Sequence, residues 1–239
     1  MGTTAAANLS ITGIGEASGG TYRHVSITGE GMINGDLYCE KFACTGKSIV
    51  NGSAKVDTLM WITGTSQISN NLNTAQLKIN GQLDCEQTVT SKDIFCRGSI
   101  HVKEDLHGDK VRILGELTTE GDCGAEIFHV KGRFSISGLL NAGEMNIKLY
   151  GECYAGEIGG ESIRIRKSNA LLRLFQFLKK PQLETESIEG DHIWLENTKA
   201  GIVRGKQVTI GPGCEIDLVE YKEQLHIDHK SIVRVNKQV

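Results

Sequence analysis

The sequence has little proline, few aromatic residues and no long apolar run, and each scarcity excludes a class of protein. Only two of the 239 residues are proline although 29 are glycine, so the chain is not collagen, which needs both in abundance. Aromatic residues make up 5% of the chain and leave little surface for stacking nucleic-acid bases. The longest uncharged run, residues 58–77, is rich in Ser, Thr, Asn and Gln and therefore does not predict a transmembrane helix.

Charge and cysteine content narrow the cellular setting. The formal net charge is −3, so no overall basic field points to a nucleic-acid partner. The first ten residues contain neither the basic stretch nor the apolar stretch of a secretory signal. The seven cysteines include no close-spaced pair, which favours a reducing compartment over a disulfide framework. We therefore expect a cytoplasmic protein.

Glycines recur at a nearly constant interval through the first two thirds of the chain. Each follows an apolar-x-apolar stretch, and successive members of the series lie 16 to 19 residues apart, most often 17. The series is Gly13, Gly29, Gly46, Gly64, Gly81, Gly98, Gly115, Gly132 and Gly151. A fixed period of this length indicates a repeat architecture.

Within each repeat the apolar residues fall on alternate positions, which predicts strands with one buried face. Four positions carry the pattern, and their occupants are Val25, Phe42, Leu77, Ile94, Val111 and Phe128; Ile27, Cys44, Ile79, Cys96, Ile113 and Val130; Ile33, Val50, Cys85, Val102, Thr119 and Ile136; and Leu37, Ala54, Val89, Leu106, Cys123 and Leu140. Glycines and Asn-Gly or Asp-Gly steps supply the corners.

These features predict an all-β fold, a parallel β-helix solenoid with coils of about 17 residues. Coils would stack about 4.8 Å apart, so that equivalent residues form aliphatic ladders. Burial of five or six side chains per coil, at about 1.5–3 kcal/mol each, would stabilise the stack but not a single coil. Cys39, Cys44, Cys85, Cys96, Cys123 and Cys153 fall on inward positions, and we interpret them as small core residues rather than metal ligands.

The pattern changes after residue 166, where a short amphipathic helix is expected. Ser168 or Asn169 can cap it, and Pro181 follows its end. Leu171, Leu174, Phe175 and Leu178 form one apolar stripe, beside Arg173, Lys179 and Lys180 on other faces. The stripe could cap the solenoid, or it could be the face that contacts a membrane or a partner.

Strand alternation then resumes, which gives four segments. We expect a disordered tail at 1–8, the β-helix domain at 9–166, the helix and an acidic solvated linker at 167–187, and a second short β-solenoid segment at 188–235. The last segment could continue the first stack or pack beside it.

The repeating units, with Gly-x-Ile-x-Gly as at residues 31–35, resemble the bactofilins, polymer-forming cytoskeletal proteins of bacteria. The stretch 208–221, VTIGPGCEIDLVEY, is similar to the C-terminal portion of the longer bactofilin-like proteins of Gram-positive bacteria. The resemblance spans residues 9–235 and implies a right-handed β-helix that assembles end to end without nucleotide. It also implies scaffolding roles in cell shape, envelope growth or motility, often at the membrane. The short tails, the helix and the second β segment depart from the commonest bactofilin pattern, so the family's interface residues are not carried over.

A solenoid has two open ends, and no capping helix precedes the first coil, which contains Leu9, Ile11 and Ile14. We hypothesise that this end stacks on another copy, so that a charge at Ile11 or Ile14 would break polymers and leave the monomer folded. The expected partner is the chain itself, with a paralogue and a peripheral membrane contact as further possibilities. No nucleic acid, small-molecule substrate, cofactor or metal is expected.

The alternative is an acyltransferase-like β-helix enzyme. Such enzymes repeat an aliphatic residue every six positions and use a loop histidine. Residues 208–213 fit one such step, but a period of 17 does not divide into sixes. The histidines are scattered, at His24, His101, His107, His129, His192, His226 and His229, and the last two are the tightest pair. The sequence favours a protein without catalysis.

Overall fold

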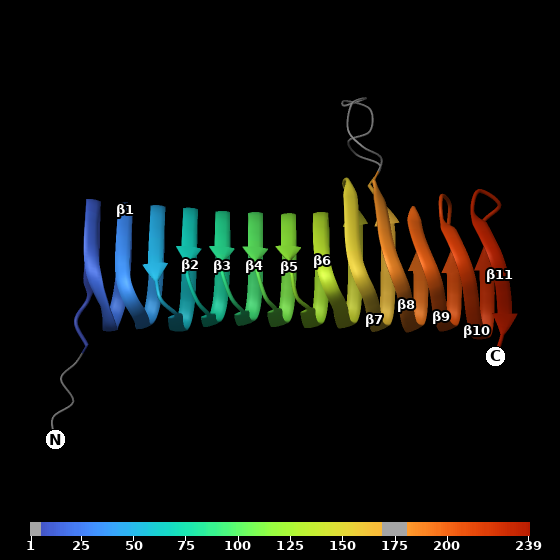
Figure 1. Ribbon diagram of the computed structural model, residues 1–239, viewed down its shortest axis with the longest axis horizontal. Helices are drawn as coiled ribbons and strands as arrows, with labels where there is room; N and C mark the ends of the chain where they lie inside the picture. Colours follow the sequence, from blue (N-terminus) through green and yellow to red (C-terminus); the bar gives the residue numbers. More distant parts are fainter. Residues whose placement is uncertain (1–5, 169–180) are drawn as a thin grey trace, which may run out of the picture. The chain divides into compact units, whose positions relative to one another are not determined.

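The computed structural model describes residues 6–168 and 181–239, and all regular structure in these ranges is β-strand. The chain divides into two compact units, residues 1–110 and 111–239, and each is a parallel β-solenoid. Within each unit the strands pair in the order of the sequence (Figure 1). The fold class expected from the repeat is therefore confirmed, while the predicted helix, with Leu171, Leu174, Phe175 and Leu178, lies outside the described residues.

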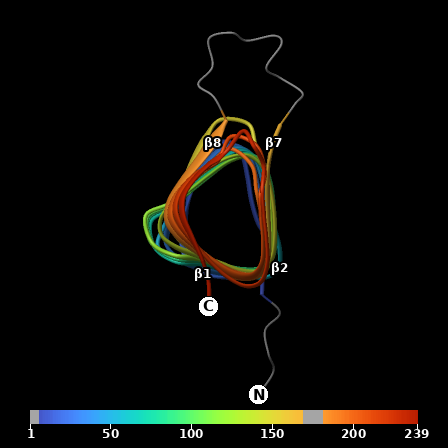
Figure 2. The same cartoon turned by 90° about the vertical axis from the view of Figure 1, so that its right-hand side faces the viewer.

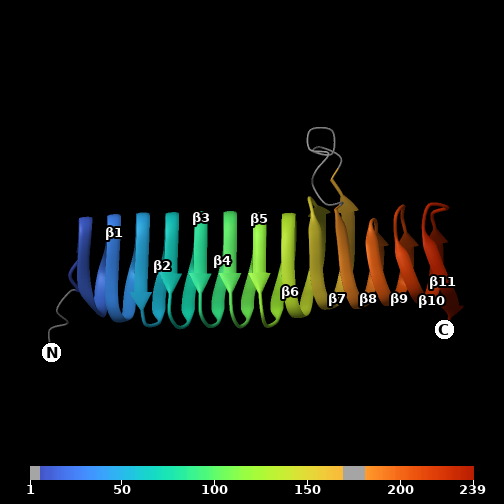
Figure 3. The same cartoon turned by 45° about the horizontal axis from the view of Figure 1, so that its top comes forward.

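The first unit contains four strands and the start of a fifth. They are β1 (Leu9–Asn51), β2 (Ala54–Ile68), β3 (Leu72–Cys85), β4 (Val89–Val102) and β5 (Leu106–Thr119), the last of which continues into the second unit. Ala54 pairs with Leu72, which pairs in turn with Val89, so each coil lies in register on the next. Figure 3 shows β2, β3 and β4 side by side.

The second unit continues with six more strands. They are β6 (Cys123–Leu149), β7 (Glu152–Lys167), β8 (Gln182–Leu195), β9 (Thr198–Ile210), β10 (Glu215–Ile227) and β11 (Ile232–Gln238). β8 pairs in parallel with β7 through Cys153 and Leu183, so the C-terminal β segment continues the stack of this unit. Seen along the coils, each turn of chain runs round an enclosed interior (Figure 2).

The strand pattern resumes at Gln182, within the stretch predicted to be an acidic solvated linker ending at residue 187. Glu184 and Glu186 are exposed there, but Thr185 between them is buried, as are Leu183 before them and Ile188 after them. The acidic residues are thus the outward half of an alternating strand. The many charged residues obscured the period-2 pattern in the sequence. Residues 182–187 are therefore part of a strand and not of a solvated linker.

The interior consists of the ladders that the repeat predicted. All twenty-four residues at the four repeat positions named above are buried. Polar groups inside are paired; for example, the hydroxyls of Ser48 and Ser66 lie 2.8 Å apart in adjacent coils. Among the described residues, no buried side-chain nitrogen or oxygen lacks a hydrogen-bond partner. The packing of the ladders and the hydrogen bonding of the buried polar groups therefore both favour a single register of the coils.

The recurring glycines form a column in which backbones of successive coils approach closely. Gly64 has φ +117°, a conformation that L side chains rarely adopt. A Cβ placed on Gly64 would lie 2.1 Å from the carbonyl oxygen of Gly46 in the preceding coil. Only glycine fits this corner without moving the neighbouring backbone, which explains the regular spacing in the sequence.

We predict that Gly64→Ala lowers the free energy of unfolding by about 2 kcal/mol or more, because it adds both backbone strain and a clash with a main-chain oxygen. Urea denaturation followed by circular dichroism measures the change. Thr65→Ala, at the next residue in the same coil, is the matched control and should cost less than about 1 kcal/mol. Equal effects from the two variants would contradict the role assigned to the glycine column.

Candidate functional site

The structure separates the three residues expected at the N-terminal end of the first unit. Leu9 is half-buried and Ile11 is 7% exposed, so both face the interior of the first coil. Ile14 is 87% exposed and lies on the outside, directly after the corner glycine Gly13. A charge at Ile11 would therefore disturb the first coil itself, and Ile14 is the cleaner position for testing assembly. That these residues form an assembly surface stays a prediction.

This first coil presents an edge with few features that oppose pairing. Within the described part of the first unit, the coil that starts at Leu9 stacks on the following coil only, through contacts such as the Arg23 N–H donating to the Ala7 carbonyl at 2.9 Å. Between Leu9 and Tyr22 the only charged side chain is Glu16, and proline is absent. Charges and prolines are the usual protection of a strand edge against pairing, and residues 9–22 contain one charge and no proline.

The last coil of the second unit is also incompletely covered. Leu225, Ile227 and Val233 face inward but are half-buried, whereas their partners in the preceding coils, Val208, Ile210 and Ile216, are buried. Charges are dense in this coil, and the Arg234 guanidinium lies 3.2 Å from the Asp217 carboxylate. The apolar edge is thus flanked by charged groups.

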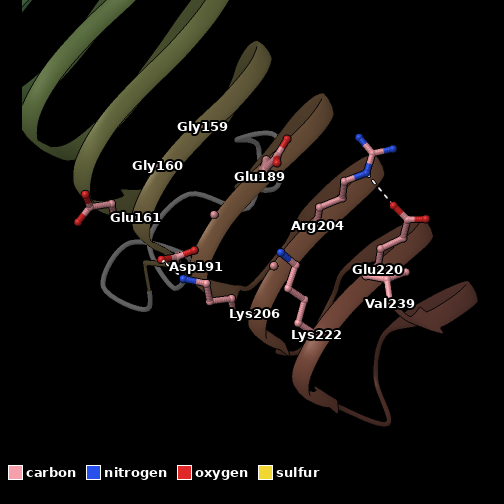
Figure 4. Close-up of a pocket in the computed structure, with 12 residues that line it drawn as sticks. Gly159, Gly160, Glu161, Glu189, Asp191, Arg204, Lys206, Glu220, Lys222 and Val239 are labelled. Carbon is pink, nitrogen blue, oxygen red and sulfur yellow. Dashed lines mark hydrogen bonds and ion pairs between the residues drawn. The ribbon is translucent and has the colours of Figure 1, made fainter.

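A groove of about 450 Å³ crosses the second unit where three glycines align (Figure 4). Gly160 pairs with Gly190, and Gly190 with Gly205, so the floor of the groove is bare backbone. Its walls are charged side chains from β7 to β10, namely Glu161, Glu189, Asp191, Arg204, Lys206, Glu220 and Lys222. The groove is open and of mixed charge.

Two ion pairs dominate the walls of the groove. Lys206 Nζ lies 2.7 Å from Asp191 Oδ2, and Arg204 Nε lies 2.7 Å from Glu220 Oε2. Hydrogen bonding to Lys206 lowers the pKa of Asp191, and the same bond raises the pKa of Lys206. The Lys206, Asp191 and Arg204 side chains are about half exposed, so the two pairs contribute little to stability. The described lining residues include no Ser, Cys or His.

The sequence reasoning did not identify this groove. The two pairs join residues 15 and 16 positions apart in the sequence. Opposite charges repeating at nearly one coil length were the available signal, and they lie within residues 188–235, the segment predicted to be a second short β-solenoid.

All seven cysteines are buried and free, as the core interpretation expected for the six it named. Burial raises the pKa of Cys96 and Cys123 to about 12 and that of Cys85 and Cys214 to about 11, from the usual 9.0. These thiols stay protonated near neutral pH and lack the thiolate that reacts with electrophiles or metals.

The histidines lie apart from one another at the surface or near it. Most of them adjoin a carboxylate, as His129 does with Glu144 at 3.4 Å and His229 with Asp228 at 3.5 Å. Within residues 6–168 and 181–239, no group of three or more His, Cys, Asp or Glu side chains could hold a metal ion. No helix long and apolar enough to cross a membrane occurs in the same ranges.

Two relatives from one bacterium match nearly the full chain. The uncharacterized protein YhbF of Bacillus subtilis (strain 168) is 34% identical, over 98% of this chain and 98% of the relative. The uncharacterized protein YhbE of the same strain is 36% identical, over 97% of this chain and 98% of the relative. No protein-family model and no solved structure matches the chain.

The buried cysteines give a testable expectation. At pH 8 a thiol-specific disulfide reagent should modify none of the seven in the folded protein and all seven in urea. An added exposed thiol, Ser26→Cys, is the positive control. Above pH 9 the unfolded chain releases thiol protons while the folded chain, with a pKa of about 12 at Cys96, does not, so the free energy of unfolding should fall as pH rises. Rapid labelling of native thiols would contradict the burial.

Proposed function

The chain belongs to the same family as Bacillus subtilis YhbF and YhbE, and on that premise we propose that it is a non-catalytic, self-assembling scaffold of the bactofilin type. The observation that supports this most directly is the open N-terminal edge of the first unit. It combines the half-buried, inward-facing Leu9 with a single charge between Leu9 and Tyr22.

A second copy can satisfy this edge by continuing the ladders. Each coil within the unit already contacts its neighbour through in-register parallel pairing, and an added coil would repeat the same contacts at about 4.8 Å. The unpaired backbone groups and the half-buried Leu9 would then be covered. Since every interaction is backbone pairing and apolar burial, assembly requires neither nucleotide nor metal.

The proposal extends to partners and location. The polymer is built from identical copies, and a paralogue can co-assemble, since two relatives of similar identity occur together in one Bacillus subtilis strain. The scaffold is cytoplasmic with a peripheral membrane contact, and it serves cell shape, envelope growth or motility. An acyltransferase of this fold would instead form a discrete trimer, so the assembly state separates the two readings.

The test is the assembly of an Ile14→Lys variant. We expect filaments or large oligomers of the unaltered protein in negative-stain microscopy without nucleotide, and we expect the variant to remain small in light scattering after size exclusion. Ile14 is exposed, so the variant should keep the circular dichroism spectrum and melting curve of the unaltered protein. Thr65→Lys is the control, since Thr65 occupies the same outward column further inside the stack and should leave assembly intact.

Two results would overturn the proposal. One is a small, uniform oligomer of the unaltered protein under all conditions. The other is unchanged polymers of the folded Ile14→Lys variant, which would move the contact away from the first coil.

A further inference from the structure

Four cations project from one outward face of the second unit, on successive coils. Lys131, Lys148, Arg164 and Arg166 alternate with buried residues in β6 and β7. Lys148 pairs in register with Arg166, and Asn146 with Arg164. The Tyr150 N–H donates to the Gly132 carbonyl at 3.0 Å, which places the coil of Lys148 next to that of Lys131. We call these four residues the basic face.

In the stretches 112–114, 129–131, 146–148 and 164–166, the outward positions besides the four cations are Arg112, Leu114, His129 and Asn146, and none of these is a carboxylate. In the next coil Glu196 follows the Ile165–Leu195 pair and lies beside Arg166, and its carboxylate accepts a hydrogen bond from the Lys167 N–H at 3.1 Å. Carboxylates at its margins already have partners, since Glu144 lies 3.4 Å from His129 and Glu116 lies 2.8 Å from Arg133. Among the described residues, no carboxylate lies within ion-pair distance of the four cations.

The fold itself does not require these charges. Like charges directly opposite one another on paired strands are destabilising, as for Lys148 beside Arg166. The equivalent columns of the first unit hold the neutral residues Ser26, Thr28 and Thr45 in the early coils. They also hold Lys78 and Arg97, but these pair in register with Phe95 and Asn80 rather than with another cation. The unfavourable stacking in the second unit therefore points to a negatively charged partner outside the chain.

Aromatic rings lie beside two of the cations. The Arg164 guanidinium lies 5.1 Å from the centre of the Trp194 ring, and Lys148 Nζ lies 6.0 Å from that of Tyr150. Trp194 is 39% exposed and pairs in register with Arg164, so it belongs to the same surface. Trp and Tyr next to basic residues are the side chains that favour the headgroup level of a membrane.

We propose that the basic face binds the phosphate groups of an anionic phospholipid surface. The cations do not converge on one point, as they would around a single phosphate; they are spread along neighbouring strands of a sheet, which suits a planar array of headgroups. The contact is separate from the N-terminal edge. It specifies the membrane partner of the proposed scaffold and does not depend on self-assembly.

The test is sedimentation with vesicles of phosphatidylglycerol mixed with phosphatidylcholine, and with vesicles of phosphatidylcholine alone. We expect binding only to the anionic vesicles, weakening as salt is added. The double variant Lys148→Gln with Arg166→Gln should bind on the order of thirtyfold more weakly, because each of the two removed cations contributes a similar share of the attraction to the anionic surface. Lys47→Gln with Lys55→Gln removes equal charge from exposed positions elsewhere and should change affinity less than threefold. Scattering confirms that compared samples have the same assembly state.

Three outcomes would overturn the proposal: equal binding to neutral vesicles, equal losses from the two double variants, or no binding to anionic vesicles. A parallel titration with duplex DNA tests whether the basic face binds nucleic acid, the alternative polyanion. If the Lys148→Gln and Arg166→Gln changes weaken DNA binding and leave vesicle binding intact, the face recognises nucleic acid instead. Filament formation is read separately by microscopy, so failure here is distinguishable from failure of the scaffold proposal.

Discussion

The close stacking of backbone on backbone at the corner glycines is the constraint on which each unit depends. Gly64 sits so near the Gly46 carbonyl that no side chain fits, and the same approach recurs from coil to coil. This contact fixes where each strand turns, and therefore which residues face inward. The aliphatic ladders, the buried Ser48–Ser66 hydrogen bond and the outward charge columns all follow from that register. A one-residue slip would reverse every face at once.

The interior could be predicted from the sequence because its signal is local. Alternation of period 2 between corner glycines assigns each side chain to a face without knowledge of the neighbouring coil, and Thr119 and Cys123 were placed inside on that basis alone. The outer surface depends on pairing between coils, which local pattern does not reveal. The Lys206–Asp191 and Arg204–Glu220 pairs were missed for this reason. Ile14 was grouped with Ile11 because both are apolar, although the turn at Gly13 sends them to opposite faces.

The ends of a solenoid follow different physics from its middle. An interior coil satisfies its backbone groups on both sides, whereas a terminal coil must leave one side to water, to a cap or to another chain. The first coil of the first unit carries one charge between Leu9 and Tyr22, and the last coil of the second unit is rich in charges such as Arg234 and Asp217. Charge discourages edge pairing, so the first coil, with its single charge, opposes pairing with another chain less than the last coil does.

The outward columns of the second unit show two ways of placing charge on a stacked fold. In the groove, opposite charges face each other across adjacent coils, and Lys206 and Asp191 compensate each other. On the basic face, Lys148 lies beside Arg166 and gains nothing from the neighbouring coil. In-register stacking amplifies either choice, because a column repeats its chemistry every coil. A column of paired opposite charges favours one register. A column of like charges leaves its electrostatic field available to a partner. The same repeat that builds the core thus creates binding surfaces, and their sign can be assigned only after the coils are aligned.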